Sequence, residues 1–349
     1  MASTIKEIAA RLNVSVATVS RALNDLPGVG EKTRRRVRKA AAELGYVPDF
    51  HARALVSGKV PFLALVVPDI TNSFFPALAL AAEEEASAAG FSLLLFNTNS
   101  QPGRMRQALD LLASRRVSGL ILAEPIDSSL SGSIEILPFE RSMVFAGVEA
   151  PAGSAACSVL VDDFDGGRQV GLHLVEQGVR TVAFVGGPEN NRNSSLRLAG
   201  LRSVNAGSND RPALDIVATT AGSWTEQSGY EQAAQVFKSG VPDAVFAAND
   251  LLALGVMRFV GGLGILPGRG MALCGYDDTP IVSRVFPALT SVAQPEAEIG
   301  VESVRRLLSC LAGHERRDSL TLKAVIRPRS STLEFKSNII NGGFAANGG

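Results

Sequence analysis

The sequence contains few of the residues from which reactive centres are built. Its 349 residues include three Cys, three His and one Trp, and no apolar run is long enough to cross a membrane. Cys157, Cys274 and Cys310 are far apart in apolar surroundings, which predicts buried reduced thiols rather than a disulfide or a metal site. The histidines lack a metal-ligand spacing, and no GxGxxG phosphate loop occurs. These absences argue against an enzyme, a metal or cofactor site and a membrane protein.

The chain also lacks net charge, but its charges are unevenly distributed. It has 34 basic and 34 acidic residues, of which residues 1–60 hold 11 and 5, leaving 23 and 29 for the remainder. A basic N-terminal segment of this kind suits contact with phosphates. No charged, apolar, small-residue leader opens the sequence, so we expect a cytoplasmic protein.

Residues 4–24, TIKEIAARLNVSVATVSRALN, predict two short helices joined by a tight turn. Thr4 and Glu7 have the spacing of a capping box, and apolar residues then recur at helical spacing. Ser15 is a natural N-cap for the second helix. The pattern indicates a helix-turn-helix. The residues of the second helix expected to face the first are Val19, Ala22 and Leu23.

The opposite face of the second helix carries small and polar side chains. Val16, Ala17, Ser20 and Arg21 should point outward, where Val16 can meet a thymine methyl and Arg21 a guanine or a phosphate. An ordinary amphipathic helical pair within a core explains these residues equally well. Residues 31–44, EKTRRRVRKAAAEL, add a third helix with a mostly basic outer face, which favours the DNA interpretation.

Several short strings, taken in order along the chain, resemble one family. They are VSVATVSRALN at 14–24, TRRRVRKAAAELGYVPD at 33–49, ARAL at 52–55, RLAG at 197–200, AND at 248–250, GYDDT at 275–279 and RPRSST at 327–332. Their order and spacing make the chain similar, nearly end to end, to LacI/GalR-family bacterial transcription regulators. The resemblance implies a sequence-specific DNA-binding regulator, with a repressor as the expected role. It implies DNA contacts from Thr4, Ser15, Val16, Ala17, Thr18, Ser20, Arg21 and Asn24.

Residues 48–60 separate this head from the first strand of the body. Asp49 and Gly58 could begin and end a short helix, although eight or nine residues make a poor helix alone. In the family, this hinge helix pairs with its copy from a second subunit in the minor groove. The resemblance therefore places Leu55 as a wedge in a base step and Ala52 where the two helices approach. A plain interdomain linker would accommodate both residues as well.

From residue 62 onward, apolar strand-like runs alternate with helical stretches. One series of runs begins at residues 62, 92, 119, 143 and 158, and a second series begins at 182, 215, 244 and 271. Strands this apolar are buried on both faces, which predicts parallel sheets with helices on either side. The predicted fold class is α/β, with a three-helix head and a hinge helix joined to two doubly wound lobes that resemble periplasmic binding proteins.

By the same resemblance, the chain crosses between the lobes three times, near Val161, Val292 and Ile326. The Gly- and Asn-rich tail has no heptad pattern, so we expect a flexible tail and a homodimer rather than a tetramer. The expected parts are a DNA-binding domain at 1–47, the hinge at 48–60, an effector-binding and dimerisation domain at 61–332 and the tail at 333–349. Within that domain, the N-lobe is expected at about 61–160 and 293–325 and the C-lobe at about 161–292.

Ligands of doubly wound lobes bind outside the carboxyl ends of the strands. The residues that follow the strand-like runs are acids, amides, one Arg and aromatics, which suit the hydroxyls and C–H faces of a sugar. Arg197 in RLAG matches the family's grip on the effector. Phe74 and Phe75 could instead be core, Asp277 a helix cap and Trp224 the cover of a lobe edge. The predicted effector-binding residues are Asn72, Phe74, Phe75, Asp127, Asn193, Arg197, Trp224, Asn249, Asp277 and Gln294.

The sequence departs from the family at Gly147, where many members carry an acid after the fourth strand. This departure removes a hydroxyl acceptor, so the sequence does not name the sugar. The expected partners are double-stranded DNA with a pseudo-palindromic operator, a small polar effector with a sugar as the expected class, and a second copy of the chain. A solute-binding protein without a transcriptional role would share the body, but it needs a signal sequence and no basic head.

Overall fold

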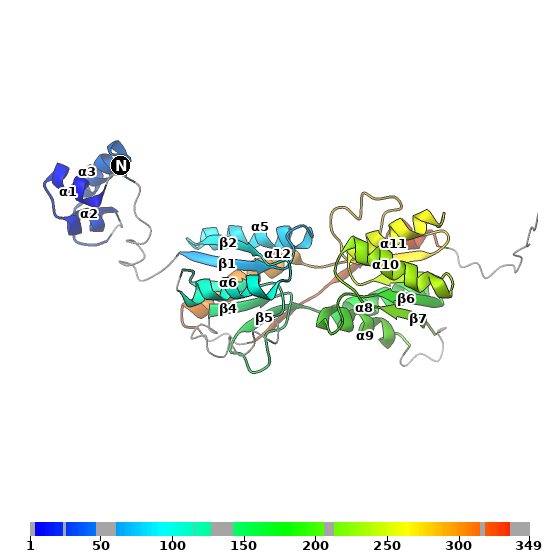
Figure 1. The fold of residues 1–349 in the computed structure, drawn as a ribbon. Coiled ribbons are helices and arrows are strands. Elements are labelled where there is room, and N and C mark those ends of the chain that lie inside the picture. The colour runs from blue at the N-terminus through cyan, green and yellow to red at the C-terminus, as the bar shows by residue number, and fades with distance from the viewer. Residues whose placement is uncertain are drawn as a thin grey trace, which may run out of the picture. The chain divides into compact units, whose positions relative to one another are not determined.

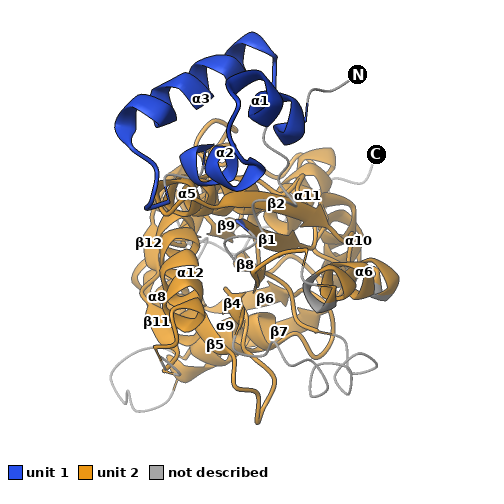
Figure 2. Cartoon of the chain, turned by 90° about the vertical axis from the view of Figure 1, so that its left-hand side faces the viewer, with its two compact units in different colours: residues 1–61 blue, residues 62–349 orange. Residues whose placement is uncertain are grey.

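The computed structural model describes residues 4–23, 26–46, 61–114, 116–126, 142–205, 213–314 and 318–335. The chain divides into two compact units, residues 1–61 and 62–349, which Figure 2 distinguishes by colour. Four predicted features lie outside the described residues: Asn24, the hinge with Ala52 and Leu55, Asp127, and most of the tail.

The described part of the first unit contains three helices, α1 (Ile5–Leu12), α2 (Val16–Leu23) and α3 (Glu31–Glu43), as predicted (Figure 1). At the start of α1, the Thr4 N–H donates to Glu7 Oε2 at 3.2 Å. At the start of α2, Ser15 Oγ accepts from the Thr18 N–H at 3.0 Å. Both helix starts are therefore fixed by the capping residues that the sequence indicated.

One small core holds the three helices together. Ile8, Val19, Ala22 and Val37 are fully buried, and each comes from the apolar face expected of its helix. Full burial of a side chain the size of Ile8 contributes about 1.5–3 kcal/mol relative to exposure. The three helices therefore depend on one another for stability, because none of them is long enough to be stable alone.

Arg34 departs from the predicted outward-facing basic set of α3. Its side chain is half-buried, and its guanidinium donates to the Leu26 and Val29 carbonyl oxygens at 3.2 and 3.4 Å. These carbonyls belong to the segment that leads into α3. Arg34 therefore ties that segment to the helix as well as contributing positive charge.

The second unit contains two six-stranded sheets. The N-lobe sheet has the order β11-β5-β4-β3-β1-β2, with every neighbouring pair parallel. Its strands are β1 (Phe62–Val67), β2 (Ser92–Asn97), β3 (Gly119–Leu122), β4 (Met143–Ala146), β5 (Cys157–Val161) and β11 (Leu320–Leu322). The sheet joins segments far apart in the sequence, because its last strand comes from near the end of the described chain.

The C-lobe sheet has the order β12-β10-β9-β8-β6-β7 and is parallel except for the antiparallel pair β10 and β12. Its strands are β6 (Thr181–Val185), β7 (Asp215–Thr220), β8 (Ala244–Ala247), β9 (Ala272–Asp277), β10 (Thr290–Ala293) and β12 (Val325–Arg327). The inner strands β8 and β9 are buried along their whole length, whereas β7 alternates between exposed and half-buried residues. This difference follows from the place of β7 at the sheet edge.

Helices cover the faces of both sheets, and they pack in pairs (Figure 1). In the N-lobe, α5 (Phe74–Ala88) packs against α12 (Glu296–Leu311), and α6 (Pro102–Ala113) contacts β1. In the C-lobe, α8 (Asp163–Glu176) packs against α9 (Arg192–Ser203), and α10 (Glu226–Val236) packs against α11 (Asp250–Gly262). A 3₁₀ turn, η2 (Phe237–Ser239), follows α10, and a short helix, α13 (Ser330–Leu333), contacts β9 and β10.

The chain passes between the two lobes three times: from β5 to α8, from β10 to α12 and from β11 to β12. Strand β10 therefore belongs to the C-lobe sheet, while the neighbouring strands β11 and β12 are divided between the two sheets. Gln169 of α8 holds the third passage, because its Nε2 donates to the Ala324 carbonyl at 2.9 Å and its Oε1 accepts from the Ile326 N–H at 3.0 Å.

None of the described helices is both long enough and apolar enough to cross a bilayer.

Candidate functional site

The outward face of α2 presents the side chains that the sequence predicted. Val16, Ala17 and Arg21 are exposed, and Ser20 is half-buried. The accessible fraction of the Val16 surface is 43%, so this side chain is free to contact a partner. The small residues lie at the N-terminal end of the helix, which is the end that approaches base edges in helix-turn-helix proteins.

Three other predicted DNA contacts lie at helix starts. Ser15 and Thr18 share a hydroxyl hydrogen bond of 2.8 Å at the start of α2, and Thr18 is half-buried. Thr4 is exposed at the start of α1. Hydroxyls and N–H groups at helix starts are typical phosphate contacts, so these roles agree with a DNA surface.

The body contains a cleft of about 790 Å³ lined by residues of both lobes. Nine of the ten predicted effector residues line it, and the tenth, Asp127, lies outside the described residues. The expectation that ligands bind outside the carboxyl ends of the strands therefore identified cleft residues from distant parts of the sequence. Those nine are Asn72, Phe74, Phe75, Asn193, Arg197, Trp224, Asn249, Asp277 and Gln294.

Arg197 is the buried cation of the cleft. Its Nε donates to Asp163 Oδ1 at 2.7 Å, its Nη1 donates to the Ala248 carbonyl at 2.6 Å, and its guanidinium lies 3.6 Å from the Tyr276 ring centroid. Burial opposes its charged form, but the nearby Asp163, Tyr276 and Asp277 outweigh burial and leave the pKa of Arg197 above its ordinary value. The guanidinium is therefore a fixed donor at the cleft wall.

The packing of α8 against α9 sets the position of Arg197. A Cβ on Gly167 would lie 2.0 Å from the Arg197 carbonyl oxygen, and a Cβ on Gly200 would lie 1.9 Å from the Phe164 carbonyl oxygen. Only glycine permits this backbone approach. The approach brings the first residue of α8, Asp163, within hydrogen-bonding distance of the arginine on α9.

Asp277 and Gln294 form a second polar pair at the C-lobe wall. Gln294 Nε2 donates to Asp277 Oδ1 at 2.7 Å, and Arg197 Nη1 lies 4.0 Å from the same oxygen. Burial raises the pKa of Asp277, and Arg197 partly counteracts this rise. The predicted alternative of a helix cap does not apply, because Asp277 ends strand β9.

Asn72 and Asn249 present their amide NH₂ groups to the cleft for a structural reason. Asn72 Oδ1 accepts from the Phe74 N–H at 3.1 Å, and Asn249 Oδ1 accepts from the Leu252 N–H at 2.8 Å at the start of α11. In each of these two side chains, the amide oxygen accepts a hydrogen bond from a backbone N–H group. The NH₂ group then remains as a donor for the cleft.

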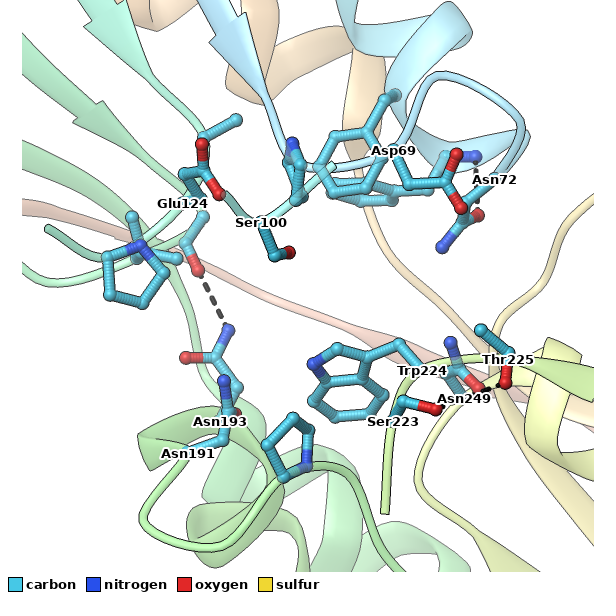
Figure 3. Close-up of a pocket in the computed structure, with 18 of the residues that line it drawn as sticks. Asp69, Asn72, Ser100, Glu124, Asn191, Asn193, Ser223, Trp224, Thr225 and Asn249 are labelled. Atoms are coloured by element: carbon cyan, nitrogen blue, oxygen red, sulfur yellow. Dashed lines mark hydrogen bonds between the residues drawn. The ribbon is translucent and has the colours of Figure 1, made fainter. Parts of the chain in front are cut away.

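Aromatic side chains lie on both sides of the cleft. Phe74 and Phe75 meet edge to face at 5.1 Å, with Phe74 part of the hydrophobic core and Phe75 half-buried against it. On the other lobe, Trp224 packs over Gly187, where a Cβ would lie 2.3 Å from the indole. Figure 3 shows the Trp224 indole facing into the cleft. Each phenylalanine thus lines the cleft and also contacts the core.

Two contacts connect the lobes directly beside the cleft. Asn193 Nδ2 donates to the Gly147 carbonyl at 2.8 Å, as the dashed line in Figure 3 shows, and Arg192 pairs with Glu149 at 2.5 Å. Gly147 has a φ of 71°, a conformation that glycine adopts readily. The position at which the family resemblance predicted an acid therefore contributes a backbone acceptor to lobe contact.

The sequence analysis missed several lining residues, above all Glu124 and the turn after β2. Asn99, Ser100, Gln101 and Glu124 all line the cleft. The available signal was position, because these residues directly follow β2 and β3 at the carboxyl edge of the N-lobe sheet. After β3, the sequence analysis named Asp127 and missed Glu124, a buried acid three residues before it.

Two parts of the chain match known protein families. Residues 4–49 match the bacterial regulatory proteins of the lacI family, and residues 172–332 match a periplasmic binding protein-like domain. The lactose operon repressor of Escherichia coli (strain K12) is 32% identical over 335 residues, which are 95% of this chain and 91% of that protein.

Solved structures show the same similarity. The lac repressor dimer bound to operator and the anti-inducer ONPF has a TM-score of 0.85 at 29% identity, covering 95% of this chain and 100% of that one. A LacI family transcriptional regulator from Enterococcus faecium with bound ribose has a TM-score of 0.68 at 28% identity, covering 79% and 100%. These similarities confirm the resemblance predicted from the short sequence strings. The chain belongs to the lacI family of bacterial regulatory proteins.

Proposed function

We propose that this protein is a cytoplasmic, homodimeric transcriptional repressor whose operator affinity changes when a sugar or sugar derivative occupies the cleft. The observation that carries the proposal is the presence, in one chain, of an exposed helix-turn-helix face and a polar and aromatic cleft lined by two lobes. The first suits a major groove, and the second suits a small polyhydroxylated molecule.

The position of the cleft supports control by a ligand. The residues proposed to bind it come from both lobes, with Asn72 and Phe75 on one side and Arg197, Asp277 and Trp224 on the other. A ligand that contacts both sides favours one relative position of the lobes over others. The related lac repressor dimer bound to operator and the related regulator with bound ribose support the two halves of the proposal.

The proposal assigns specific DNA contacts to the head. Val16, Ala17 and Arg21 read base edges, and two heads related by a two-fold axis read a pseudo-palindrome. The proposal also includes the wedge role of Leu55, which inserts into a central base step instead of serving as a plain linker.

Selection of bound fragments from a random DNA pool, followed by gel shifts, tests this function. Full-length protein should enrich a pseudo-palindrome, and Arg21→Ala should weaken binding to it by about tenfold to a hundredfold, since a base contact of this kind is worth about 1–3 kcal/mol. Arg106→Ala, an exposed arginine of α6 in the body, is the matched control and should bind as the parent does. Enriched fragments without symmetry, or equal effects of the two substitutions, would contradict the proposal.

A further inference from the structure

Glu124 is a buried acid in the cleft with one hydrogen-bonding partner. It follows β3, lines the cleft and is 7% exposed. Thr98 Oγ1 donates to Glu124 Oε1 at 2.5 Å, and the side chain accepts no other hydrogen bond from the described residues. Burial raises the pKa of Glu124, and the Thr98 hydrogen bond partly opposes this rise. A carboxylate accepts several hydrogen bonds, so this side chain has unused acceptor capacity.

Thr98 fixes the orientation of this acid. It is fully buried after β2, and its hydroxyl has a single proton, which the short contact with Glu124 takes in preference to the Val67 carbonyl at 3.4 Å. The same oxygen accepts from the Ser100 N–H at 3.1 Å. Thr98 therefore holds Glu124 and the cleft-lining Ser100 together, and Figure 3 shows both on the side of the cleft opposite Trp224.

Carboxyl groups outnumber cations on the described wall of the cleft. Its described lining carries four carboxyl groups, from Asp69, Glu124, Glu189 and Asp277, and a single cation, Arg197. That cation is not available to balance a ligand's negative charge, because it forms a 2.7 Å ion pair with a buried aspartate of α8. A phosphate or carboxylate on the ligand would lie among carboxyl groups without a free cation, which disfavours its binding.

Glu124 lies at the same level as the lobe contact described above. Leu122 of β3 pairs with Phe145 of β4, so Glu124 and Gly147 each lie two residues beyond this pair at adjoining strand ends. Gly147 offers the cleft no side chain, and its carbonyl already accepts from Asn193. Among the described lining residues at the ends of β3 and β4, Glu124 is therefore the side chain that can accept a ligand's hydrogen.

We infer that Glu124 is a specificity-determining residue that accepts a hydrogen bond from a hydroxyl or ammonium group of the ligand, and that the cleft takes neutral or amino sugars and rejects their phosphorylated and carboxylated counterparts. The inference rests on the proposed function, because it names the ligand class of the same cleft. Thr98 is a positioning residue that acts through Glu124.

Matched sets of sugars test the inference on the full-length protein. Each set contains a neutral sugar, its amino sugar, its uronic acid and its 6-phosphate, built on glucose and on galactose, with ribose and ribose 5-phosphate added. Thermal-shift measurements identify binders, and titration calorimetry gives their affinities. The neutral or amino members should bind, and the anionic members should bind at least tenfold more weakly.

Substitutions then assign the selectivity to one side chain. Glu124→Gln keeps the shape but removes the charge, so affinity for the neutral or amino binder should fall by about tenfold to a hundredfold, and the preference over the anionic counterpart should shrink. Thr98→Val should reduce the same selectivity ratio, and Thr98→Ser should restore it. Glu83→Gln, at an exposed position of α5 away from the cleft, is the matched control and should leave affinity unchanged. Operator gel shifts without sugar verify that every variant is folded.

The outcomes separate the inference from the function on which it rests. Strongest binding by a phosphate or uronic acid, or equal affinity of the parent and Glu124→Gln, would overturn the role of Glu124 while leaving a sugar-responsive regulator intact. Binding of operator DNA without binding of any sugar in the sets would contradict the proposed effector class and the inference together.

Discussion

At the scale of single residues, the buried charges of the body are stable only with their partners. Arg197 is 4% exposed, and its 2.7 Å pair with Asp163 satisfies both charges. Removal of one partner from such a pair leaves the other charge buried and uncompensated. The arginine therefore contributes to stability as well as to the cleft.

This reasoning predicts a difference between two arginine pairs that lie close together. Arg197→Met should lower the free energy of unfolding by about 3–5 kcal/mol, because Asp163 stays buried without its partner. Arg168→Met removes the exposed pair with Asp165 and should cost less than about 1 kcal/mol. Urea unfolding followed by circular dichroism measures both values, and equal losses would show that the Arg197 pair is not buried in solution.

A second residue-scale prediction concerns His173, whose ring contacts Thr332 Oγ1 at 2.8 Å. Burial lowers the pKa of His173 below its ordinary value of 6.5, so the unfolded chain binds its proton more readily than the folded chain does. The free energy of unfolding should therefore fall as the pH drops from about 7 to about 5, through the unfolded pKa. Chemical unfolding across this range should show a smaller fall in His173→Gln.

His314→Gln is the control for this profile, because His314 is exposed. It should follow the parent's pH dependence. A His173→Gln profile that also follows the parent would assign the pH dependence to other groups.

The predictable residues were those with a local pattern or a specific motif. The caps Thr4 and Ser15 and the cleft position of Arg197 could be read from spacing and from RLAG. Arg34 and Glu124 could not, because their roles depend on carbonyl and hydroxyl groups that only the tertiary structure brings near them. A run of basic residues does not reveal which member turns inward, and a strand end does not reveal which of the next few side chains enters the cleft.

At the scale of elements, close helix packing positions the arginine of the cleft wall. Gly200 brings α9 against α8, and a side chain there would meet the Phe164 carbonyl and the Arg168 N–H. A Cβ added to Gly261, near the end of α11, would meet open space, so packing requires a glycine at 200 but not at 261.

Alanine at these two positions should have effects of opposite sign. Gly200→Ala should destabilise the body by about 1–3 kcal/mol or more, because the helices must separate to admit the methyl group. Gly261→Ala should stabilise it by up to about 1 kcal/mol, since alanine reduces the conformational entropy lost in a helix. Differential scanning calorimetry gives both shifts, and stabilisation by Gly200→Ala would contradict the packing described for α8 and α9.

The elements themselves were largely predictable, because inner parallel strands form apolar runs and helices repeat their apolar residues at helical spacing. The assignment of strands to the two sheets was less predictable from the sequence. Residues 320–326 form one apolar run, yet Leu322 ends a strand of the N-lobe and Val325 begins a strand of the C-lobe. The division depends on Gln169, whose side chain holds the connecting residues from 155 and 157 positions away in the sequence.

At the scale of the whole molecule, the two lobes of the body are connected by three chain passages and, among the described residues, by the Asn193–Gly147 and Arg192–Glu149 contacts. Ligand binding between the lobes has to change the energy of one lobe arrangement relative to another for the head to respond. Such coupling is reciprocal, because the factor by which ligand changes operator affinity equals the factor by which operator changes ligand affinity.

Titration calorimetry of the sugar that binds most tightly, with and without saturating operator DNA, tests this coupling most directly. The account predicts that operator shifts the sugar dissociation constant by about 5- to 150-fold, the range typical of coupling between sites, and that sugar shifts the operator dissociation constant by the same factor in gel shifts. A sugar affinity identical with and without operator would contradict the claim that the cleft controls the head.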